Sequence, residues 1–554
     1  MVETEKPKPD TNLSLDDIFI ENKFATKWQI LMLFLSCVSL FHSGMFVISP
    51  SFFRTKQPFV CADEKYSSNC DQSNSTSCEQ TDVCSLSCSE YSFNYNGTGL
   101  SSSIQESYSL VCGREILLEV HGSFYFLGLL LGSLIAGFMS DRIGRMKWIR
   151  VSFFLCTIFG IIMALSESYV MHLVAWTIIN TTNISTWVCL FVYTAETVKT
   201  DFRHVAGQFV GMFFGIGIMV GVGFSVFIPN WRHLILAYSG VAFVDFIISL
   251  FISESPRWLW ARKRYEETSD IIHTAARLSG VTLPKETEQA LIDLSEIGVR
   301  KESFLKTVVT DLRRMFNFAE KIDKTTAENS DTDSKKQYSV IDIFKHRVLS
   351  IRMILLALHW VCVNCLFYAI LFGASMFKQN VHVYALFQGF GSFSGCVLGI
   401  LLLNFFGRKT MVIFCLNFAG LVFFTCIFIP TSWQFTTLFL AFVGKVVLQL
   451  FFQLCYQWTA DLMPTVVRTS ALGFGSLMAR ITGLAIPYIG LLSEIWTPLP
   501  LIFYSSFAFL VVVATLFLPE TRGKRLPNTI EEGNVFCTKF EKHPTNKLND
   551  TLTL

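Results

Sequence analysis

One lysine and one arginine lie near the middle of long apolar segments in the second half of this 554-residue chain. Lys445 lies in segment 434–458 and Arg480 in segment 470–492, and the apolar segments of this half contain no acidic residue. Charges at membrane depth are costly and by default functional. Two cations without an acid predict an anion site, in which the arginine fork would hold a carboxylate or sulfate with two hydrogen bonds. The alternative is an arginine paired only with carbonyl groups and water.

Polar and aromatic side chains share a helical face with these cations. Positions i, i+4, i+7, i+8 and i+11 lie on one side of a helix, and here they are Lys445, Gln449, Phe452, Gln453 and Tyr456. Segment 350–372 presents a similar set, consisting of Trp360, Asn364, Phe367 and Tyr368. Rings supply contact area to an amphipathic organic ligand, and amides orient it. For each ring alone, packing or anchoring at the membrane interface is nearly as good an explanation.

His42, Asp245 and His359 also lie in apolar segments. His42, in segment 28–49, is a candidate to contact substrate or to sense protonation, although a hydrogen-bonded core histidine explains it equally well. We interpret His359 as structural. Asp245, in segment 233–252, either pairs with a polar neighbour or takes part in proton coupling.

Enzyme chemistry finds no support in the sequence. Gly444-Lys445 is followed by Val446 within an apolar segment, so it is not a nucleotide-binding loop, and no cluster has the spacing of metal ligands or of an activated nucleophile. We therefore expect no cofactor, no metal ion and no nucleotide hydrolysis. The basic residues gather beside predicted helix ends, which argues against nucleic-acid binding.

Membrane helices must position these side chains. Hydrophobic residues make up 51% of the chain and charged residues only 16%, so lipid is its main solvent. Twelve apolar runs approach the roughly 20 residues that cross a bilayer: 28–49, 120–140, 148–166, 169–195, 205–228, 233–252, 350–372, 382–404, 410–430, 434–458, 470–492 and 499–518. The predicted fold class is an all-α membrane protein with six helices in each half.

The two halves repeat one another. Matched pairs recur at nearly constant offsets, namely Gly144 and Gly407 (263 positions), Glu196 and Asp461 (265), Arg203 and Arg468 (265), and Glu254 and Glu520 (266). Duplicated halves of about six helices are typical of secondary transporters. In the repeated loop, the second copy has Asn404 where the first has Asp141.

The repeated loop is predicted to form a latch. Glycine permits a tight turn, while basic side chains meet carboxylates and helix ends. We expect Asp141, Arg142 and Arg145 to engage Glu196 and Arg203, with the first copy mattering more. The other gating candidates are Glu254, Arg257, Arg408, Asp461, Arg468 and Glu520. The alternative is that these charges only set membrane topology.

Basic residues crowd alternate connections, which are therefore predicted to be cytoplasmic. The predicted organisation is a cytoplasmic N-terminus (1–27), an N-terminal half (28–252) with an extracellular loop (50–119), a cytoplasmic linker (253–349), a C-terminal half (350–518) and a cytoplasmic tail (519–554). The first 27 residues show no removable signal peptide. Within the linker, Tyr265 to Leu278 is a candidate amphipathic helix.

The predicted extracellular loop carries two signals of that compartment. Its six cysteines predict disulfides, with fifteen possible pairings, and are Cys61, Cys70, Cys78, Cys84, Cys88 and Cys112. Asn74 and Asn96 begin glycosylation sequons. The matches at Asn180 and Asn183 fall inside a predicted helix and are interpreted as chance.

Several runs carry a family resemblance. The run from Gly137 to Arg145 resembles the loop signature of the major facilitator superfamily. The match narrows to its organic-ion transporter family through Glu254-Ser255-Pro256-Arg257-Trp258-Leu259, Met463-Pro464-Thr465-Val466-Val467-Arg468 and Leu518-Pro519-Glu520-Thr521-Arg522-Gly523.

Within that family, Arg480 and Lys445 resemble the organic anion branch, since cation carriers tend to have Asp at the arginine position. The resemblance also places His42, Trp360, Tyr368 and Phe452 where anion transporters carry functional residues. Two departures stand out: Cys396 lies where many anion carriers have a basic residue, and segment 169–195 lacks the usual arginine, with Trp176 and Asn180 nearby.

Together these features imply a multi-pass plasma-membrane carrier of small organic anions, such as carboxylates and sulfate conjugates. Exchange for a counter-anion or an ion gradient would drive it, and its halves would move about a central site. A zwitterion or cation carrier is the first rival, which Cys396 and Asp245 keep open. The second is a non-transporting receptor or regulator, against which the cost of unused buried charges argues.

Overall fold

The structure is a computed structural model that describes residues 25–61, 84, 91–95, 99–198, 203–280, 283, 288–289, 340–377, 379–402, 405–430, 432–464, 466–522, 527 and 529–536. The chain divides into two compact units, which we describe one at a time. Unit 1 comprises Met1–Thr332 with Asn380–Phe393, and unit 2 comprises Asp333–Gln379 with Ser394–Leu554.

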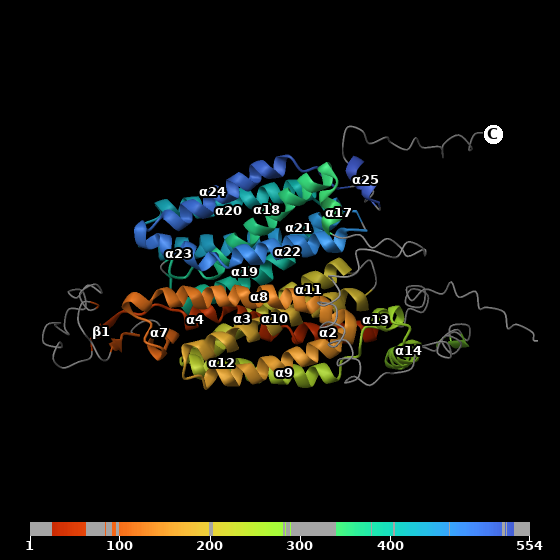
Figure 1. The fold of residues 1–554 in the computed structure, drawn as a ribbon, viewed down its shortest axis with the longest axis horizontal. Coiled ribbons are helices and arrows are strands. Elements are labelled where there is room, and N and C mark those ends of the chain that lie inside the picture. The colour runs from red at the N-terminus through yellow and green to blue at the C-terminus, as the bar shows by residue number, and fades with distance from the viewer. Residues whose placement is uncertain are drawn as a thin grey trace, which may run out of the picture. The chain divides into compact units, whose positions relative to one another are not determined.

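Unit 1 is built mainly of long helices (Figure 1). Its elements in chain order are α2 (Ala25–Val38), α3 (Phe41–Ile48), α4 (Pro50–Phe53), β1 (Phe59–Cys61), β2 (Tyr91–Phe93), α7 (Ile104–Ser107), the 3-10 turn η1 (Cys112–Arg114), α8 (Ile116–Ile143), α9 (Arg145–Ala164), α10 (Tyr169–Thr197), α11 (Arg203–Phe227), α12 (Trp231–Leu250), α13 (Pro256–Ala261) and α14 (Tyr265–Ser279). The first part of α19 (Val381–Leu402) also belongs to this unit.

Unit 2 contains the rest of α19 and the remaining helices. These are α17 (Val340–Phe344), α18 (Arg347–Leu371), α20 (Arg408–Phe428), α21 (Gln434–Leu462), α22 (Arg468–Gly483), α23 (Ile486–Ile495), α24 (Leu499–Leu516) and α25 (Ile530–Val535).

The helices confirm the predicted twelve-helix membrane fold. Within the ranges given above, eleven helical spans are long and apolar enough to cross a membrane. The remaining one is α10, whose 29 residues include Asn180, Asn183 and six threonines. These polar side chains lower the mean hydropathy of α10. The helix can carry them because a helix that is mostly shielded from lipid need not be apolar all round.

Two of the predicted helices are interrupted. The first span breaks between α2 and α3, where the Ser36 and Ser39 hydroxyls donate to backbone carbonyl groups one turn earlier, at 2.7 and 3.0 Å, a contact that bends helices. The eleventh span breaks between α22 and α23, after Gly483. Pro487 lies in the first turn of α23, where its missing N–H is tolerated.

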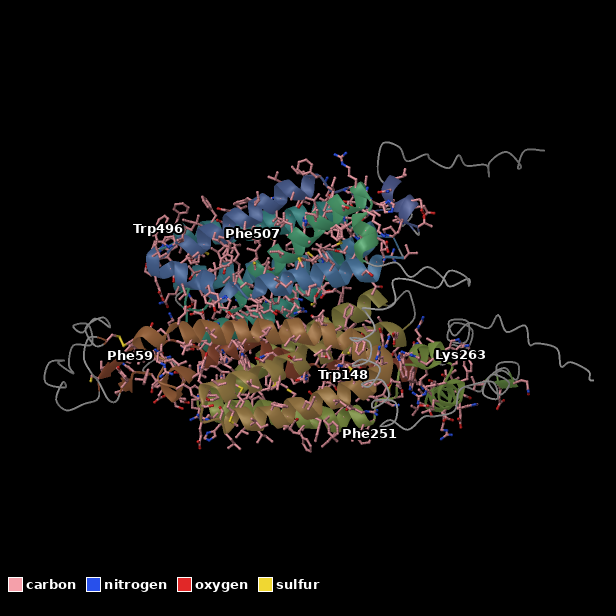
Figure 2. The ribbon with its side chains drawn as sticks, in the orientation of Figure 1. Phe59, Trp148, Phe251, Lys263, Trp496 and Phe507 are labelled. Carbon is pink, nitrogen blue, oxygen red and sulfur yellow. A yellow bond between two sulfur atoms is a disulfide. The ribbon has the colours of Figure 1, made fainter. Side chains whose placement is uncertain are left out.

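The burial of large side chains distinguishes the interior of each unit from its lipid-facing surface. Trp148 lies in the core of unit 1, where its indole N–H donates to the hydroxyl of Ser185 at 2.6 Å (Figure 2). Phe251 is 75% exposed and Trp496 is 57% exposed. Exposed side chains of this size suit a surface that faces hydrocarbon or the membrane interface.

The segments outside the long helices contain short strands and helices. In the predicted extracellular loop, Phe59 of β1 pairs with Phe93 of β2 in an antiparallel ladder. Cys84 and Cys112 form a disulfide, and Cys61 is also disulfide-bonded. In the predicted linker, the amphipathic helix forms as α14, which buries Ile272 against the core of unit 1.

Candidate functional site

Lys445 is fully buried inside unit 2, midway along α21. Its ammonium lies 3.1 Å from the centroid of the Phe367 ring on α18, a cation–π contact. No described residue exchanges a hydrogen bond with it, and the thiol of Cys396 is the titratable group that acts on it electrostatically. An ammonium held by a ring retains three donors for an anion.

Arg480 lies in the last turn of α22 and is 8% exposed. Its Nε has no hydrogen-bond partner within the part of the chain that the structure describes. Beside it, the Ala479 carbonyl accepts a hydrogen bond from Asn364 of α18 at 2.8 Å. The guanidinium also interacts electrostatically with the phenol of Tyr456 on α21. Three helices of unit 2 therefore contribute to its surroundings.

A row of aromatic rings connects the surroundings of the two cations. Phe367 and Phe452 have ring centroids 5.5 Å apart, Phe452 and Tyr456 5.6 Å, and Tyr456 and Trp360 4.5 Å. Tyr368 packs edge-on against Phe367 at 5.4 Å. The structure thus brings the predicted aromatic residues together in the edge-on and tilted geometries that such rings prefer. Their role in binding stays a prediction.

The two predicted glutamines lie beside the Cys396 thiol. The Gln449 amide nitrogen lies 3.6 Å from Sγ, and Gln453 interacts with the same sulfur. The Gln449 carbonyl oxygen has no partner among the described residues. Cys396 therefore occupies a polar position next to Lys445, although it supplies no positive charge.

Two residues near the aromatic row were not predicted. The Trp360 indole donates to the hydroxyl of Thr459 at 3.1 Å, and a Cβ added to Gly475 would lie 2.5 Å from the same indole. Thr459 follows Phe452 by seven positions, so the helical spacing already contained the signal for it.

His42 lies in unit 1, whereas Lys445 and Arg480 lie in unit 2. Its ring is fully buried, and Nδ1 lies 3.1 Å from a carboxylate oxygen of Asp245 on α12 and 2.9 Å from the Ser39 carbonyl oxygen. Asp245 thus has the polar neighbour that was one of its two predicted explanations. The ring nitrogens of His359 lie 2.6 Å from the Leu355 carbonyl and 2.8 Å from the Thr515 hydroxyl, which suits a structural residue.

In unit 1 the repeated loop is a turn capped by a carboxylate. Gly144 has φ 112° and ψ 153°, a conformation that essentially only glycine adopts, and a Cβ there would lie 2.4 Å from Oε2 of Glu254. Glu254 accepts a hydrogen bond from the Met146 amide at 3.0 Å, in the first turn of α9, where a negative charge also favours the helix dipole. Burial raises the pKa of Glu254, and the backbone donors oppose that rise.

An ion-pair network joins this loop to α10. The Arg145 guanidinium donates to the Glu196 carboxylate at 3.0 and 3.3 Å and to Asp141 at 2.6 Å. Ser255 donates to Glu196 at 2.6 Å, and Arg257 donates to the Glu196 carbonyl at 2.8 Å. Most of the predicted first-half gating residues therefore meet in one place.

Arg142 lies outside that network. Its guanidinium is 3.9 Å from the centroid of the Phe138 ring. The Asp141 carbonyl, by contrast, accepts from the Trp258 indole at 2.9 Å and from the guanidinium of Arg262 at 2.5 Å. These donors tie the end of α8 to the segment that follows α12.

Unit 2 repeats the carboxylate cap. Glu520 accepts hydrogen bonds from the amides of Arg408 at 2.9 Å and Lys409 at 3.1 Å, at the start of α20. A Cβ on Gly407 would lie 2.2 Å from Oε2 of Glu520, so a glycine again makes room for the carboxylate.

The ion pair of unit 2 is looser. Nε of Arg408 lies 3.5 Å from the Asp461 carboxylate, and the Thr521 hydroxyl lies at the same distance from that group. Arg468 acts on Asp461 electrostatically. Ser255 and Thr521 were not predicted, yet they are 266 positions apart, the offset already known for Glu254 and Glu520.

Some predicted residues fall outside the described residues. These are the sequon residues Asn74 and Asn96, the cysteines Cys70, Cys78 and Cys88, the side chain of Arg203, and Asn404.

Comparison with known proteins places this geometry in a family. Residues 64–532 match the model of the sugar (and other) transporter family. The chain belongs to this family. An organic cation transporter protein of Drosophila melanogaster is 30% identical over 452 residues, which cover 82% of this chain and 77% of the relative. The organic cation/carnitine transporter 2 of Homo sapiens is 29% identical, with 78% and 72% covered.

Solute carrier family 22 member 6 of Rattus norvegicus is 24% identical over 79% of this chain and 74% of its own length. Among solved structures, the proton:xylose symporter XylE matches with a TM-score of 0.53 at 15% identity, covering 90% of this chain and 98% of that one. That likeness supports the major facilitator fold. This member of the sugar (and other) transporter family is therefore a multi-pass membrane transporter and not an enzyme, with homologues in solute carrier family 22.

Proposed function

We propose that this transporter carries small organic anions across the plasma membrane. The observation that carries the proposal is the pair of buried cations in unit 2, Lys445 and Arg480, each with donor atoms that no described residue uses. Neither forms a salt bridge with an acidic residue in the described ranges. Unpaired charge in a low-dielectric interior is unfavourable, and an anionic substrate would relieve that cost.

The surroundings of the cations favour an aromatic or amphipathic anion. The ring row from Phe367 to Trp360 offers apolar area, and the unused amide oxygen of Gln449 can accept a hydrogen bond from a hydroxyl or N–H group elsewhere on the substrate. An arginine fork suits carboxylates and sulfate conjugates better than a point charge would. Many anion carriers have a basic residue at the position of Cys396, so this chain has two cations, Lys445 and Arg480, to meet the substrate. Two cations favour anions with one or two charges.

A cation or zwitterion carrier is the second candidate. The names of several relatives support it, since they include organic cation and carnitine transporters. Asp245 is a buried acid, but it lies beside His42 in unit 1 and so has a basic neighbour already. We favour an anionic substrate because the buried charges that lack an oppositely charged neighbour among the described residues, Lys445 and Arg480, are both positive.

Uptake by cells that express the chain tests the proposal. We expect labelled phenyl sulfate to accumulate and labelled tetraethylammonium not to; the reverse would refute the proposal and support the second candidate. Arg480→Asp should lower anion uptake about tenfold or more, because a hydrogen bond to a charged group contributes roughly 1.5–3 kcal/mol. Arg277→Asp, the same change at an exposed position on α14, is the matched control and should leave uptake unchanged.

We further propose cytoplasmic termini, glycans on Asn74 and Asn96, and exchange for a counter-anion or an ion gradient as the driving force. Asn74→Gln with Asn96→Gln should abolish the electrophoretic shift that a glycosidase produces on the wild-type protein. A shift that persists in the double variant would place the glycans elsewhere.

A further inference from the structure

A buried acid–base pair joins α3 and α12 inside unit 1. The side chains of His42 and Asp245 are 1% and 4% exposed. Nδ1 of His42 lies 2.9 Å from the Ser39 carbonyl oxygen, which can only accept a hydrogen bond, and 3.1 Å from Asp245 Oδ2, which accepts when the carboxylate is ionised. Nδ1 therefore carries the hydrogen, and Nε2 keeps a lone pair when the ring is neutral. Nε2 lies 3.4 Å from the Ser43 hydroxyl.

Few other titratable groups act on this pair. From α9, the Cys156 thiol interacts with Asp245, and the Phe153 ring packs edge-on against His42 at 4.9 Å. Arg150 of α9 uses its guanidinium on the carbonyls of Ser249 and Ile252, beyond Asp245 along the chain.

The other helices that pack on α3 bring little charge to the pair. From α12, the Tyr238 hydroxyl donates to the Gly221 carbonyl at 2.8 Å. Between residues 173 and 195, α10 contains no charged residue, and α11 contains none after His204. His42 and Asp245 are therefore the groups that determine the net charge in this part of unit 1.

A polar stripe runs along α10 towards the pair. Four of its side chains, fully or almost fully buried and spaced by three or four residues, have an atom without a hydrogen-bond partner among the described residues: His172, Trp176, Asn180 and Asn183. The two ends of the stripe are 11 positions apart, roughly 16 Å along the helix. His121 of α8 extends it, because its ring stacks on Trp176 at 5.0 Å and both ring nitrogens lack partners.

A residue beside the stripe interacts with Asp245 by way of a thiol on α9. Thr182, next to Asn183, interacts with the Cys156 thiol, and that thiol interacts with Asp245. Buried polar groups need hydrogen-bonding partners, and water is the usual one where protein atoms do not supply them. Water molecules bonded to these side chains would form a chain of hydrogen bonds of the kind that carries protons to a buried acid–base pair.

We propose that His42 and Asp245 bind and release a proton in each transport cycle, so that the proton is the ion that drives net anion movement. This inference rests on the proposed function. The unloaded pair, a neutral imidazole beside a carboxylate, has a charge of minus one. One proton from water adds to the Nε2 lone pair and leaves an imidazolium beside a carboxylate, with no net charge. Its release from Nε2 on the other side restores the first state.

The experiment uses the purified full chain in liposomes and labelled phenyl sulfate, which stays ionised at every pH used. With the outside about two pH units more acidic than the inside, net uptake should rise above uptake without a gradient, to an accumulation ratio of up to about a hundredfold for one proton per anion, since each pH unit is a factor of ten in proton activity. A protonophore should remove the rise, and a trapped pH dye should record acidification.

Asp245→Asn should lose the response to the gradient yet still exchange internal for external phenyl sulfate, a partial reaction without net proton movement that also shows correct folding. Asp245→Glu should recover part of the response. Asp270→Asn, an exposed acid on α14, should keep all of it. Anion uptake by the wild-type protein that ignores the gradient would overturn the inference and leave the proposed function intact. An Asp245→Asn protein with full gradient stimulation would also overturn it. Failure to carry any anion would refute the proposed function instead.

Discussion

The loop at Gly144 in unit 1 and the loop at Gly407 in unit 2 use the same backbone chemistry. In each, a carboxylate accepts hydrogen bonds from the first amides of the helix that follows the glycine. In each, the glycine lets that carboxylate approach closer than a side chain would allow. This geometry survives duplication because it depends on a glycine and a carboxylate, which both copies retain.

The ion pairs beyond the cap differ between the copies. Arg145 donates to two carboxylates at 2.6–3.3 Å and is 11% exposed, whereas Arg408 reaches the Asp461 carboxylate at 3.5 Å and is 28% exposed. The Ser255 hydroxyl donates to the Glu196 carboxylate at 2.6 Å, whereas the equivalent Thr521 hydroxyl lies 3.5 Å from the Asp461 carboxylate.

The difference shows that duplicated sequence need not give duplicated energetics. Coulomb energy and desolvation both change steeply with distance and burial. The backbone cap is common to both halves, and the shorter, more buried ion pairs lie in the first. Substitutions at matched positions should therefore produce unequal effects.

The largest inequality is expected at the two glycines. Gly144→Ala places a Cβ at φ 112° and against Glu254, and should destabilise the protein by about 3 kcal/mol. Gly407 has φ −69° and ψ 151°, which any residue adopts, so Gly407→Ala should cost only about 1 kcal/mol for displacing Glu520. Thermal unfolding of both purified variants measures this, and equal losses would contradict the strain argument.

A smaller inequality is expected at the two arginines. Arg145→Ala leaves the Glu196 and Asp141 carboxylates without their shared donor and should cost about 2 kcal/mol, because charged hydrogen bonds contribute roughly 1.5–3 kcal/mol each before solvent screening. Arg408→Ala should cost at most about 1 kcal/mol, since its pair is longer and more exposed. Unfolding and uptake are measured together, and a larger effect at Arg408 would reverse the comparison.

The smallest effect is expected from Asp141→Asn, which makes the first loop resemble the second at this position. The Asp141 side chain is 66% exposed, so its pair with Arg145 should contribute only about 0.5 kcal/mol. Glu196→Gln, at a side chain 20% exposed, should slow uptake more. A double-mutant cycle with Arg145 separates the two pairs, and a stronger coupling to Asp141 would show that exposure does not set the ranking.

Much of the fold followed from sequence pattern. Apolar length located twelve helices, and constant offsets paired Gly144 with Gly407 and Glu254 with Glu520. The breaks within the first and eleventh spans were missed because the apolar run continues through them. Serine hydroxyls that bond back to the helix, and a proline in the first turn of α23, interrupt the backbone without changing hydropathy.

The surroundings of Lys445 and Arg480 were predictable only in part. Helical spacing correctly placed Phe452 and Tyr456 on one face, and the packed rings confirm this juxtaposition. It did not reveal that Lys445 rests on Phe367 or that Thr459 bonds Trp360, because those contacts cross between helices nearly 80 or more residues apart in the chain.

The sequence by itself determined that the chain is a duplicated membrane protein and that two cations and one acid lie at membrane depth. These conclusions need only composition, length and spacing, which are local properties of the chain. Tertiary structure alone decided the partners: Asp245 beside His42, Lys445 over Phe367, and Arg145 between two carboxylates. The reason is physical, since contact energies depend on ångström-scale distances that only the packing of distant helices sets.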